Sequence, residues 1–258
     1  MTGLGCQKWG FRVVGAVLAL AAFIVVLIGS ILVVSQDRSF FAREYEELGV
    51  YKYVGMSEVD LARVTDALLV YLSEPNPARV EGVLEVEADI FGEWRQFLNE
   101  REIDHMADVR KLFQFGLWLC VGSVGVVLGM LVLLAVCLWR FRAEDIFARI
   151  LGPTLTGFWV GNGLMLGFLA FLVLWANMDF QGFWTAVHMT LFTNELWLLD
   201  PTKDLLIRIM QGELFFNMSI RIVVWAGAIW LGISAGMGVG HFFWRRKSLR
   251  PRTEVTGT

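Results

Sequence analysis

Residues 113–138 read FQFGLWLCVGSVGVVLGMLVLLAVCL, a run of 26 positions without a charged side chain. About 20 consecutive apolar residues let a helix cross the hydrocarbon core of a bilayer, so this stretch predicts a transmembrane helix. Similar runs occupy residues 13–34, 151–176 and 219–243. Apolar residues make up 56% of the chain and gather in these four runs, which is typical of a multispan membrane protein. We therefore predict an α-helical integral membrane protein built on a four-helix transmembrane bundle.

Basic residues beside the runs indicate how the chain crosses the membrane. Lys8 and Arg12 precede the first run, arginines gather in the link at 139–150, and five Lys and Arg residues lie in the tail at 244–258. Cytoplasmic segments carry the excess of Lys and Arg, so we expect all three, and both termini, in the cytoplasm. The first run has 22 apolar positions, longer than a signal-peptide core of about 7–15, and is expected to be retained.

Residues 35–112, between the first two spans, hold 17 acidic and 9 basic side chains. This balance favours the outer side, where the segment would form a small, mainly helical extracytoplasmic cap. Apolar side chains at helical spacing in residues 61–72 predict an amphipathic helix that ends before Pro75. A second helix is predicted to begin near Glu93 and to continue into the second span, while residues 78–92 fit either a hairpin or an irregular arm.

Residues 177–218, between the third and fourth spans, contain too many polar groups for a fifth span. Their tryptophans and phenylalanines suit the headgroup level of a membrane, so we predict an interfacial segment. Asp200-Pro201 has the form of a helix N-cap followed by proline in the first turn. It predicts a short helix that Gly212 ends.

The interfacial segment carries His188, which on a helix shares a face with Trp184, Leu191 and Glu195. Histidine titrates near neutral pH and is the commonest general base at that pH. The alternative is a structural histidine that hydrogen-bonds a backbone carbonyl, and residue type alone does not separate the two.

A second histidine, His105, lies one helical turn after Glu102 and one turn before Asp108. A carboxylate beside an imidazole can fix its tautomer and raise its basicity, whereas the alternative is a solvated acidic helix face. His105 and His188 both fall at the outer membrane boundary, while the third histidine, His241, is expected to be an anchor at the inner boundary. Two histidines at one interface form either an acid and base pair or two metal ligands, and both readings stay open.

Polar and small residues inside the spans predict helix contacts. Arg221, near the outer end of the fourth span, is expected to contact a lipid headgroup or to pair with Glu213 or Asp200. Asn162 predicts a hydrogen bond between helices, and glycines four residues apart predict close helix packing. These glycines are Gly125 and Gly129, Gly157 and Gly161, Gly163 and Gly167, and Gly232, Gly236 and Gly240.

Composition also bounds the function. The chain has three cysteines and no Cys-x-x-Cys, which does not favour a disulfide framework or a cysteine-based zinc site. It has no His-Glu-x-x-His and no phosphate-binding glycine loop. A net charge of −3 does not favour a nucleic-acid partner, and no cofactor is expected.

Two stretches resemble sequence elements of one bacterial family. Residues 99–113, NEREIDHMADVRKLF, resemble its Glu-x-x-His-Met-x-Asp-Val-Lys element. Residues 187–201, VHMTLFTNELWLLDP, resemble its second histidine element. The family is the lipoprotein intramolecular transacylases, and the similarity covers the four-span layout.

The resemblance implies an enzyme of the bacterial cytoplasmic membrane with its active site at the outer leaflet, among membrane lipids. Its substrates would be diacylated lipoproteins: the sn-2 acyl chain moves to the α-amine of the same N-terminal cysteine and leaves a lyso-form lipoprotein. His105 and His188 would divide the acid and base roles without a metal or a covalent acyl-enzyme. The residues expected to support them are Glu102, Asp108, Asn194, Glu195, Asp200, Tyr45, Tyr51, Tyr53 and Arg221.

The residues alone leave two other functions open. One is a metal-dependent membrane hydrolase that uses His105, His188 and a carboxylate such as Asp108 or Asp200. The other is a non-enzymatic four-span scaffold or sensor with an outer cap.

Overall fold

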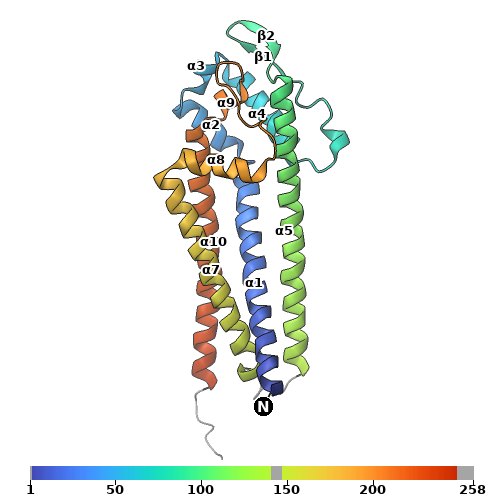
Figure 1. The fold of residues 1–258 in the computed structure, drawn as a ribbon, viewed down its shortest axis with the longest axis vertical. Helices are drawn as coiled ribbons and strands as arrows, with labels where there is room; N and C mark the ends of the chain where they lie inside the picture. Colours follow the sequence, from blue (N-terminus) through green and yellow to red (C-terminus); the bar gives the residue numbers. More distant parts are fainter. Residues whose placement is uncertain (1, 141–146, 249–258) are drawn as a thin grey trace, which may run out of the picture.

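The computed structural model describes residues 2–140 and 147–248 (Figure 1). Residues 141–146 of the predicted basic link and the end of the basic tail lie outside these residues, and so does the side chain of His241. Four helices are long and apolar enough to cross a membrane. They are α1 (Thr2–Val34), α5 (Glu100–Arg140), α7 (Gly152–Met178), which follows the short π-helix η2 (Phe147–Leu151), and α10 (Gly212–Ser248). The predicted class, a helical membrane bundle, is confirmed.

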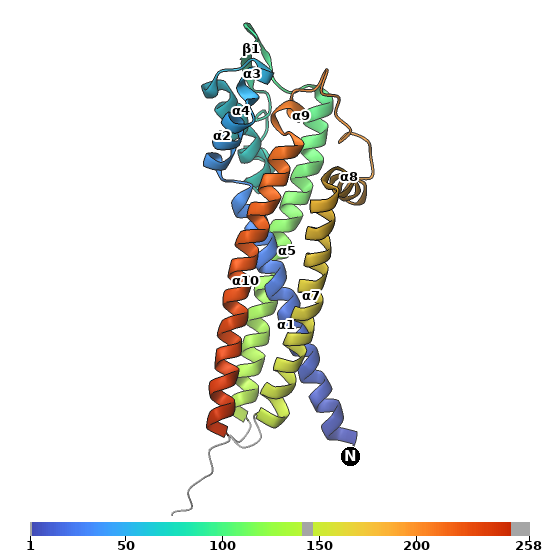
Figure 2. The ribbon, with the colours of Figure 1, turned by 90° about the vertical axis from the view of Figure 1, so that its left-hand side faces the viewer.

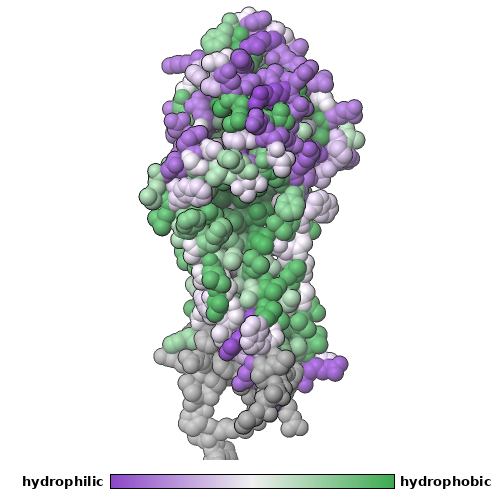
Figure 3. Space-filling model, in the orientation of Figure 1, coloured by the Kyte–Doolittle hydropathy of each residue, from purple (hydrophilic) through white to green (hydrophobic). Residues whose placement is uncertain are grey.

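The first span is the central helix of the bundle. Helix α1 packs against α7, α5 and α10, and the two views show the other three arranged around it (Figures 1 and 2). Hydrophilic side chains gather over the cap, and hydrophobic ones cover the long helices below it (Figure 3). The N-terminus and the last turn of α10 lie at the end of the bundle opposite the cap.

Among the predicted glycines whose surroundings the structure describes, only Gly157 and Gly161 form a close helix contact. A Cβ atom on Gly157 would lie 1.8 Å from the Arg12 carbonyl oxygen of α1, and one on Gly161 would touch Ala19 at 3.1 Å. Gly15 of α1 allows the same close approach from the other helix, since a Cβ on it would lie 1.9 Å from the Thr154 backbone oxygen of α7.

The other predicted glycines whose surroundings are described do not form close helix contacts. A Cβ would meet nothing within 4 Å at Gly125, Gly129, Gly163, Gly167, Gly232 or Gly236. Spacing marks a smooth helix face, but it does not say whether lipid or another helix covers it.

The polar residue predicted to join helices does so. The Asn162 side chain of α7 accepts a hydrogen bond from Trp230 Nε1 of α10 at 2.6 Å and donates one to Ser234 Oγ at 3.3 Å. Trp230 is 2% exposed and stacks on Phe158, so this polar contact lies inside an apolar layer.

The cap is mainly helical, and its core is continuous with the adjoining ends of α5 and α10. It contains α2 (Arg38–Glu47), α3 (Val50–Val54), α4 (Glu58–Ser73) and the 3-10 turn η1 (Pro77–Arg79). Asp37 caps α2 by accepting hydrogen bonds from the backbone N–H groups of Ser39 and Phe40. The apolar face predicted for residues 61–72 is buried in the cap core.

The helix predicted to begin near Glu93 begins instead at Glu100, because residues 87–96 form a hairpin. Strands β1 (Glu87–Ile90) and β2 (Glu93–Gln96) pair antiparallel. The two residues between them, Phe91 and Gly92, have φ of 55° and 87°. Two-residue hairpin turns commonly need positive φ at both positions and favour Asn-Gly or Asp-Gly. Phe-Gly is a weak signal for that turn.

The segment between the third and fourth spans contains helix α8 (Phe180–Leu191) and the short helix α9 (Leu206–Ile209). Helix α8 lies across the bundle, sideways in Figure 1 and end-on in Figure 2. The prediction that a helix begins at Asp200-Pro201 is wrong. The Asp200 carboxylate accepts from the backbone N–H and hydroxyl of Thr202 and so stabilises a turn, and Gly212 begins α10 rather than ending a helix.

Candidate active site

A cavity of about 400 Å³ lies where the cap meets the adjoining ends of α1, α5 and α10 and is closed on one side by α8. Its walls are almost entirely aliphatic and aromatic. Apart from two tryptophans, the polar side chains that line it are Ser35, Ser219, His105 and His188. Both serine hydroxyls donate to a carbonyl one turn earlier, Ser35 to Ile31 and Ser219 to Phe215. The two imidazoles therefore carry most of the chemistry available in this cavity.

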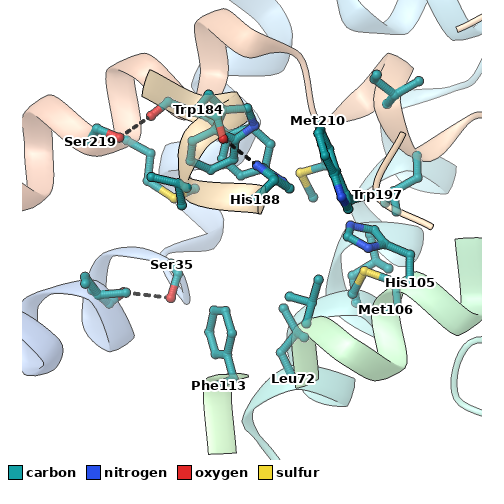
Figure 4. Close-up of a pocket in the computed structure, with 18 of the residues that line it drawn as sticks. Ser35, Leu72, His105, Met106, Phe113, Trp184, His188, Trp197, Met210 and Ser219 are labelled. Carbon is teal, nitrogen blue, oxygen red and sulfur yellow. Dashed lines mark hydrogen bonds between the residues drawn. The ribbon is translucent and has the colours of Figure 1, made fainter. Parts of the chain in front are cut away.

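His188 projects from α8 into the cavity (Figure 4). Three aromatic rings pack around it, Trp184 at 4.7 Å, Trp197 at 5.0 Å and Phe192 at 5.6 Å between ring centroids. Burial lowers the pKa of this imidazole, against a smaller opposing effect of the Trp184 carbonyl. His188 is therefore neutral near pH 7.

The Nδ1 atom of His188 lies 2.8 Å from the Trp184 carbonyl oxygen. A carbonyl oxygen only accepts, so Nδ1 carries the proton and donates it. In the neutral ring, Nε2 then holds an unshared electron pair, which is the form a general base requires. A purely structural histidine would also make this hydrogen bond to a backbone carbonyl, and here the same bond fixes the tautomer of His188.

His105 faces the same cavity from α5 and is 8% exposed. Helix α5 has 41 residues and is about 60 Å long, roughly twice the apolar thickness of a bilayer. Its first turns, with His105, therefore stand outside the apolar run 113–138. Burial, reinforced by the neighbouring His188 and opposed by Asp108, lowers the pKa of His105 to about 4.

The Nδ1 atom of His105 is buried without a hydrogen-bond partner. In folded proteins, buried N–H donors without a partner are rarer than buried acceptors without one. The favoured tautomer thus places the proton on Nε2. The ring of Phe192 contacts both imidazoles, at 5.4 Å from His105 and 5.6 Å from His188.

Asp108 lies near His105 but is hydrogen-bonded to other groups. Its carboxylate accepts from Lys111 Nζ at 2.8 Å and from Asn194 Nδ2 at 2.7 Å. These bonds lower the pKa of Asp108 and keep it charged. Asn194 is thereby engaged in joining the loop after α8 to α5.

Glu102 has a different role from the predicted orientation of His105. It is 1% exposed, and its carboxylate accepts from the backbone N–H of Asn99 at 2.8 Å and of Leu206 at 2.6 Å. Burial raises its pKa against the effect of these bonds. Asp204 complements it by accepting from Asn99 Nδ2 and from the backbone N–H of Asp200. The two carboxylates tie α9 to the start of α5.

The remaining residues expected at the site lie outside the cavity lining. Glu195 contributes its backbone carbonyl, Asp200 caps its turn, and Tyr53 is 52% exposed. Tyr45 is buried in the cap, where its hydroxyl shares a hydrogen bond of 3.0 Å with Thr65, and Tyr51 packs on its ring.

Arg221 pairs with neither predicted partner. Its guanidinium donates to the Asp37 carboxylate at 2.5 Å and lies over the Phe40 ring. This contact joins α10 to the start of α2, far from the histidines in sequence. No local pattern could have indicated a partner 184 residues away.

Two residues outside the predicted site complete it. Trp197 lines the cavity and packs on His188, although its sequence position indicated only a membrane-interface residue. Arg101 of α5 holds the loop that carries Trp197, through the Glu195 and Leu198 carbonyls. Arg101 falls one turn before His105, which is the only sequence signal that could have marked it.

The described residues do not have the geometry of a serine hydrolase or of a metal site with three or more protein ligands. Residues 232–236 read GISAG and fit the Gly-x-Ser-x-Gly pattern, but they lie inside α10, where Ser234 bonds Asn162, and not at the strand-to-helix turn of a serine hydrolase. Among the described residues, no group of three or more His, Cys, Asp or Glu side chains could hold a metal ion.

An apolar cavity at the end of a membrane bundle suits a substrate with acyl chains, and two neutral imidazoles suit proton transfer. These features define a class, the integral membrane enzymes that act on lipid-linked substrates. The family model described as Lipoprotein intramolecular transacylase Lit matches residues 16–216. The match spans most of the chain, which therefore belongs to the lipoprotein intramolecular transacylase family. Its activity is the transfer of an acyl chain within a lipoprotein, as the resemblance of the two histidine elements indicated.

Solved structures show the same fold. The membrane-integral lipoprotein intramolecular transacylase Lit from Bacillus cereus superposes with a TM-score of 0.69 at 16% identity, over 93% of this chain and 98% of that one. A variant of that protein with one histidine changed to alanine gives 0.66 at 16% identity, over 96% and 99% of the two chains. No curated protein matches the chain by sequence.

Proposed function

We propose that this chain moves the sn-2 acyl chain of a diacylglyceryl-cysteine lipoprotein to the α-amine of the same cysteine, with His105 and His188 as its catalytic residues. One observation carries the proposal: two neutral imidazoles, one buried and one half-buried, face one apolar cavity. One ring presents an electron pair and the other an N–H, which are the two groups that ester aminolysis needs.

His188 is the proposed general base. The α-amine has an ordinary pKa near 8 and attacks as the neutral NH2 form, after its ammonium proton has gone to water. Nitrogen attacks the sn-2 carbonyl carbon and forms the new C–N bond, while its proton passes to Nε2 of His188. When the tetrahedral intermediate collapses, the C–O bond to glycerol breaks and the same proton goes to the glyceryl oxygen. The products are an amide and a free hydroxyl, and no covalent acyl-enzyme is formed.

His105 is the proposed donor to the oxyanion. A ring whose pKa is lowered to about 4 stays neutral at the working pH and keeps its Nε2 proton. A neutral imidazole can stabilise a developing oxyanion through this N–H without becoming charged. Because amine and ester belong to one molecule, the cavity needs to hold a single substrate in a reactive conformation.

The charge distribution supports an orientation in the membrane with the cap on the outer side. The acidic cap would face the outer side of a bacterial cytoplasmic membrane and both termini the cytoplasm, because the basic residues flank the opposite span ends. The cavity would then lie at the outer leaflet. Acyl chains would enter it laterally from the membrane lipids, and diacylated lipoproteins would be the partners.

The test is expression in a host that makes diacylated lipoproteins with a free α-amine, followed by mass spectrometry of the lipoproteins. The unchanged chain should give the N-acylated lyso form. His105→Gln and His188→Gln should each lower the rate by about 10²-fold or more. His241→Gln, at the other end of α10, is the matched control and should leave the rate unchanged. Full activity in either of the first two variants would overturn the residue assignment.

A further inference from the structure

The aromatic packing around His188 depends on one turn outside the helices. Trp184 belongs to α8, and Phe192 follows it directly. Trp197, in contrast, lies in residues 192–205, which contain no helix or strand. Its ring nevertheless packs at 5.0 Å on His188 and lines the cavity, and Figure 4 shows it beside both histidines. The position of Trp197 thus depends on what fixes this loop.

Two side chains hold the turn that contains Trp197: Asn194, whose amide joins the backbone N–H of Leu196 to Asp108, and Arg101. The backbone N–H of Leu198 donates to the Glu195 carbonyl at 3.2 Å, which makes Trp197 the third residue of a four-residue turn. Arg101 Nη2 donates to the carbonyls at both ends of this turn, Glu195 at 2.7 Å and Leu198 at 3.0 Å. Hydrogen bonds from a charged donor are the stronger ones, and only Arg101 of these two side chains bonds both ends of the turn.

Arg101 stands one helical turn before His105 on α5. It is exposed and does not line the cavity, so it has no direct contact with the reacting groups. Its contacts nonetheless connect the helix of one histidine to the aromatic ring that packs on the other.

We propose that Arg101 is a positioning residue: it holds the Glu195–Leu198 turn so that Trp197 packs on His188 and closes the cavity beside both histidines. This inference rests on the proposed role of His188. Its effect reaches the chemistry through Trp197 alone.

The physical consequence of losing Arg101 is a misplaced and hydrated base. A displacement of about 1 Å at a catalytic group can cost on the order of 10²-fold in rate. Burial is the main cause of the lowered pKa of His188, so water beside the ring brings this pKa back towards 6.5. The ionisable group that faces it from α5 is His105, whose pKa is lowered to about 4, so it stays uncharged over the same range.

The experiment compares Arg101→Ala, Arg101→Lys and Trp197→Ala, the double variant of Arg101→Ala with Trp197→Ala, and Arg63→Ala. Arg63 is the matched control, because it also bonds a backbone carbonyl, that of Glu87, and packs on a tryptophan, but in the cap hairpin. Rates are measured by mass spectrometry on detergent-purified protein and synthetic diacylated lipopeptide, across pH 5–9. Thermal unfolding checks that each variant is folded.

We expect Arg101→Ala to lower kcat by about 10–100-fold with little change in KM, and to move the acid limb of kcat to higher pH. Arg101→Lys should recover part of the rate, because one ammonium can reach only part of the two-carbonyl geometry. The double variant should be no slower than Trp197→Ala alone, since both act through one contact.

Two results would overturn the inference: additive losses in the double variant, or Arg101→Ala with the rate and pH profile of Arg63→Ala. His188→Gln, measured alongside, separates this failure from failure of the proposed function. If His188→Gln is inactive while Arg101→Ala is unaffected, only the role of Arg101 is wrong.

Discussion

Replacing Glu102 with alanine tests whether this carboxylate supports the fold or the neighbouring histidine. The structure indicates the fold. The change would leave the part-buried N–H of Asn99 and the buried N–H of Leu206 without an acceptor. Each unpaired buried donor costs about 1–3 kcal/mol, which gives a range of about 2–6 kcal/mol.

The raised pKa of Glu102 narrows that range. It means that burial already penalises the charged carboxylate, with Asp204 adding repulsion, and removing the group relieves both penalties. We therefore expect the lower part of the range, about 2–3 kcal/mol. For a chain of this length such a loss lowers the unfolding temperature by roughly 4–12 °C.

The assay is thermal unfolding of the purified protein in detergent, alongside lyso-form production at a temperature where the variant is folded. Asp104→Ala is the matched control, since Asp104 is an exposed carboxylate on the same helix. It should change stability by less than about 0.5 kcal/mol. A Glu102→Ala variant that unfolds like the unchanged protein but has lost activity would refute the reasoning. Glu102 would then act by orienting His105.

Three further outcomes are expected. Gly157→Ala should destabilise the contact between α1 and α7 and lower the unfolding temperature, because its Cβ would lie 1.8 Å from a backbone oxygen, whereas Gly163→Ala, with nothing within 4 Å, should not. Arg221→Ala should cost about 1–3 kcal/mol in the same assay by leaving the half-buried Asp37 carboxylate without its cation, and a change at Asp37 added to it should cost only about 1 kcal/mol more, for the lost cap of α2. His105 has a pKa near 4 in the folded chain and 6.5 in the unfolded chain. Its contribution to the free energy of unfolding is therefore complete above pH 6.5 and is lost as the pH falls towards 4, by up to about 3 kcal/mol. His105→Asn should flatten this pH dependence in unfolding scans.

Patterns confined to one element could be predicted from the sequence. Apolar runs and helical spacing depend on neighbours within a few residues, and these indicated the spans, helix α4 and the two histidines that share the cavity. The glycine spacing shows the limit. It identified six positions that face no other helix, and it missed Gly15, whose small partner on α1 is Ala19 rather than glycine.

Long-range partners could not be predicted. Glu102 was expected beside His105 because one turn separates them, yet its carboxylate bonds a backbone N–H 104 residues later. Asp200 was expected to cap a helix, but the helix begins only at Leu206, after a turn held by Asp204. Such bonds are chosen by tertiary packing, since a buried N–H takes the acceptor that the fold brings to it.

The two proposed catalytic residues differ in how their positions are fixed. His105 lies on α5, a single helix from Glu100 to Arg140, so its place is set by the packing of a membrane span. His188 lies on the 12-residue helix α8, and its ring rests partly on a turn that Arg101 holds from outside. Rigid helices fix geometry better than loops do. Changes in residues 193–205 should therefore act on the proposed general base first and affect the proposed oxyanion donor less, so that a loosened loop slows the chemical step more than it weakens binding.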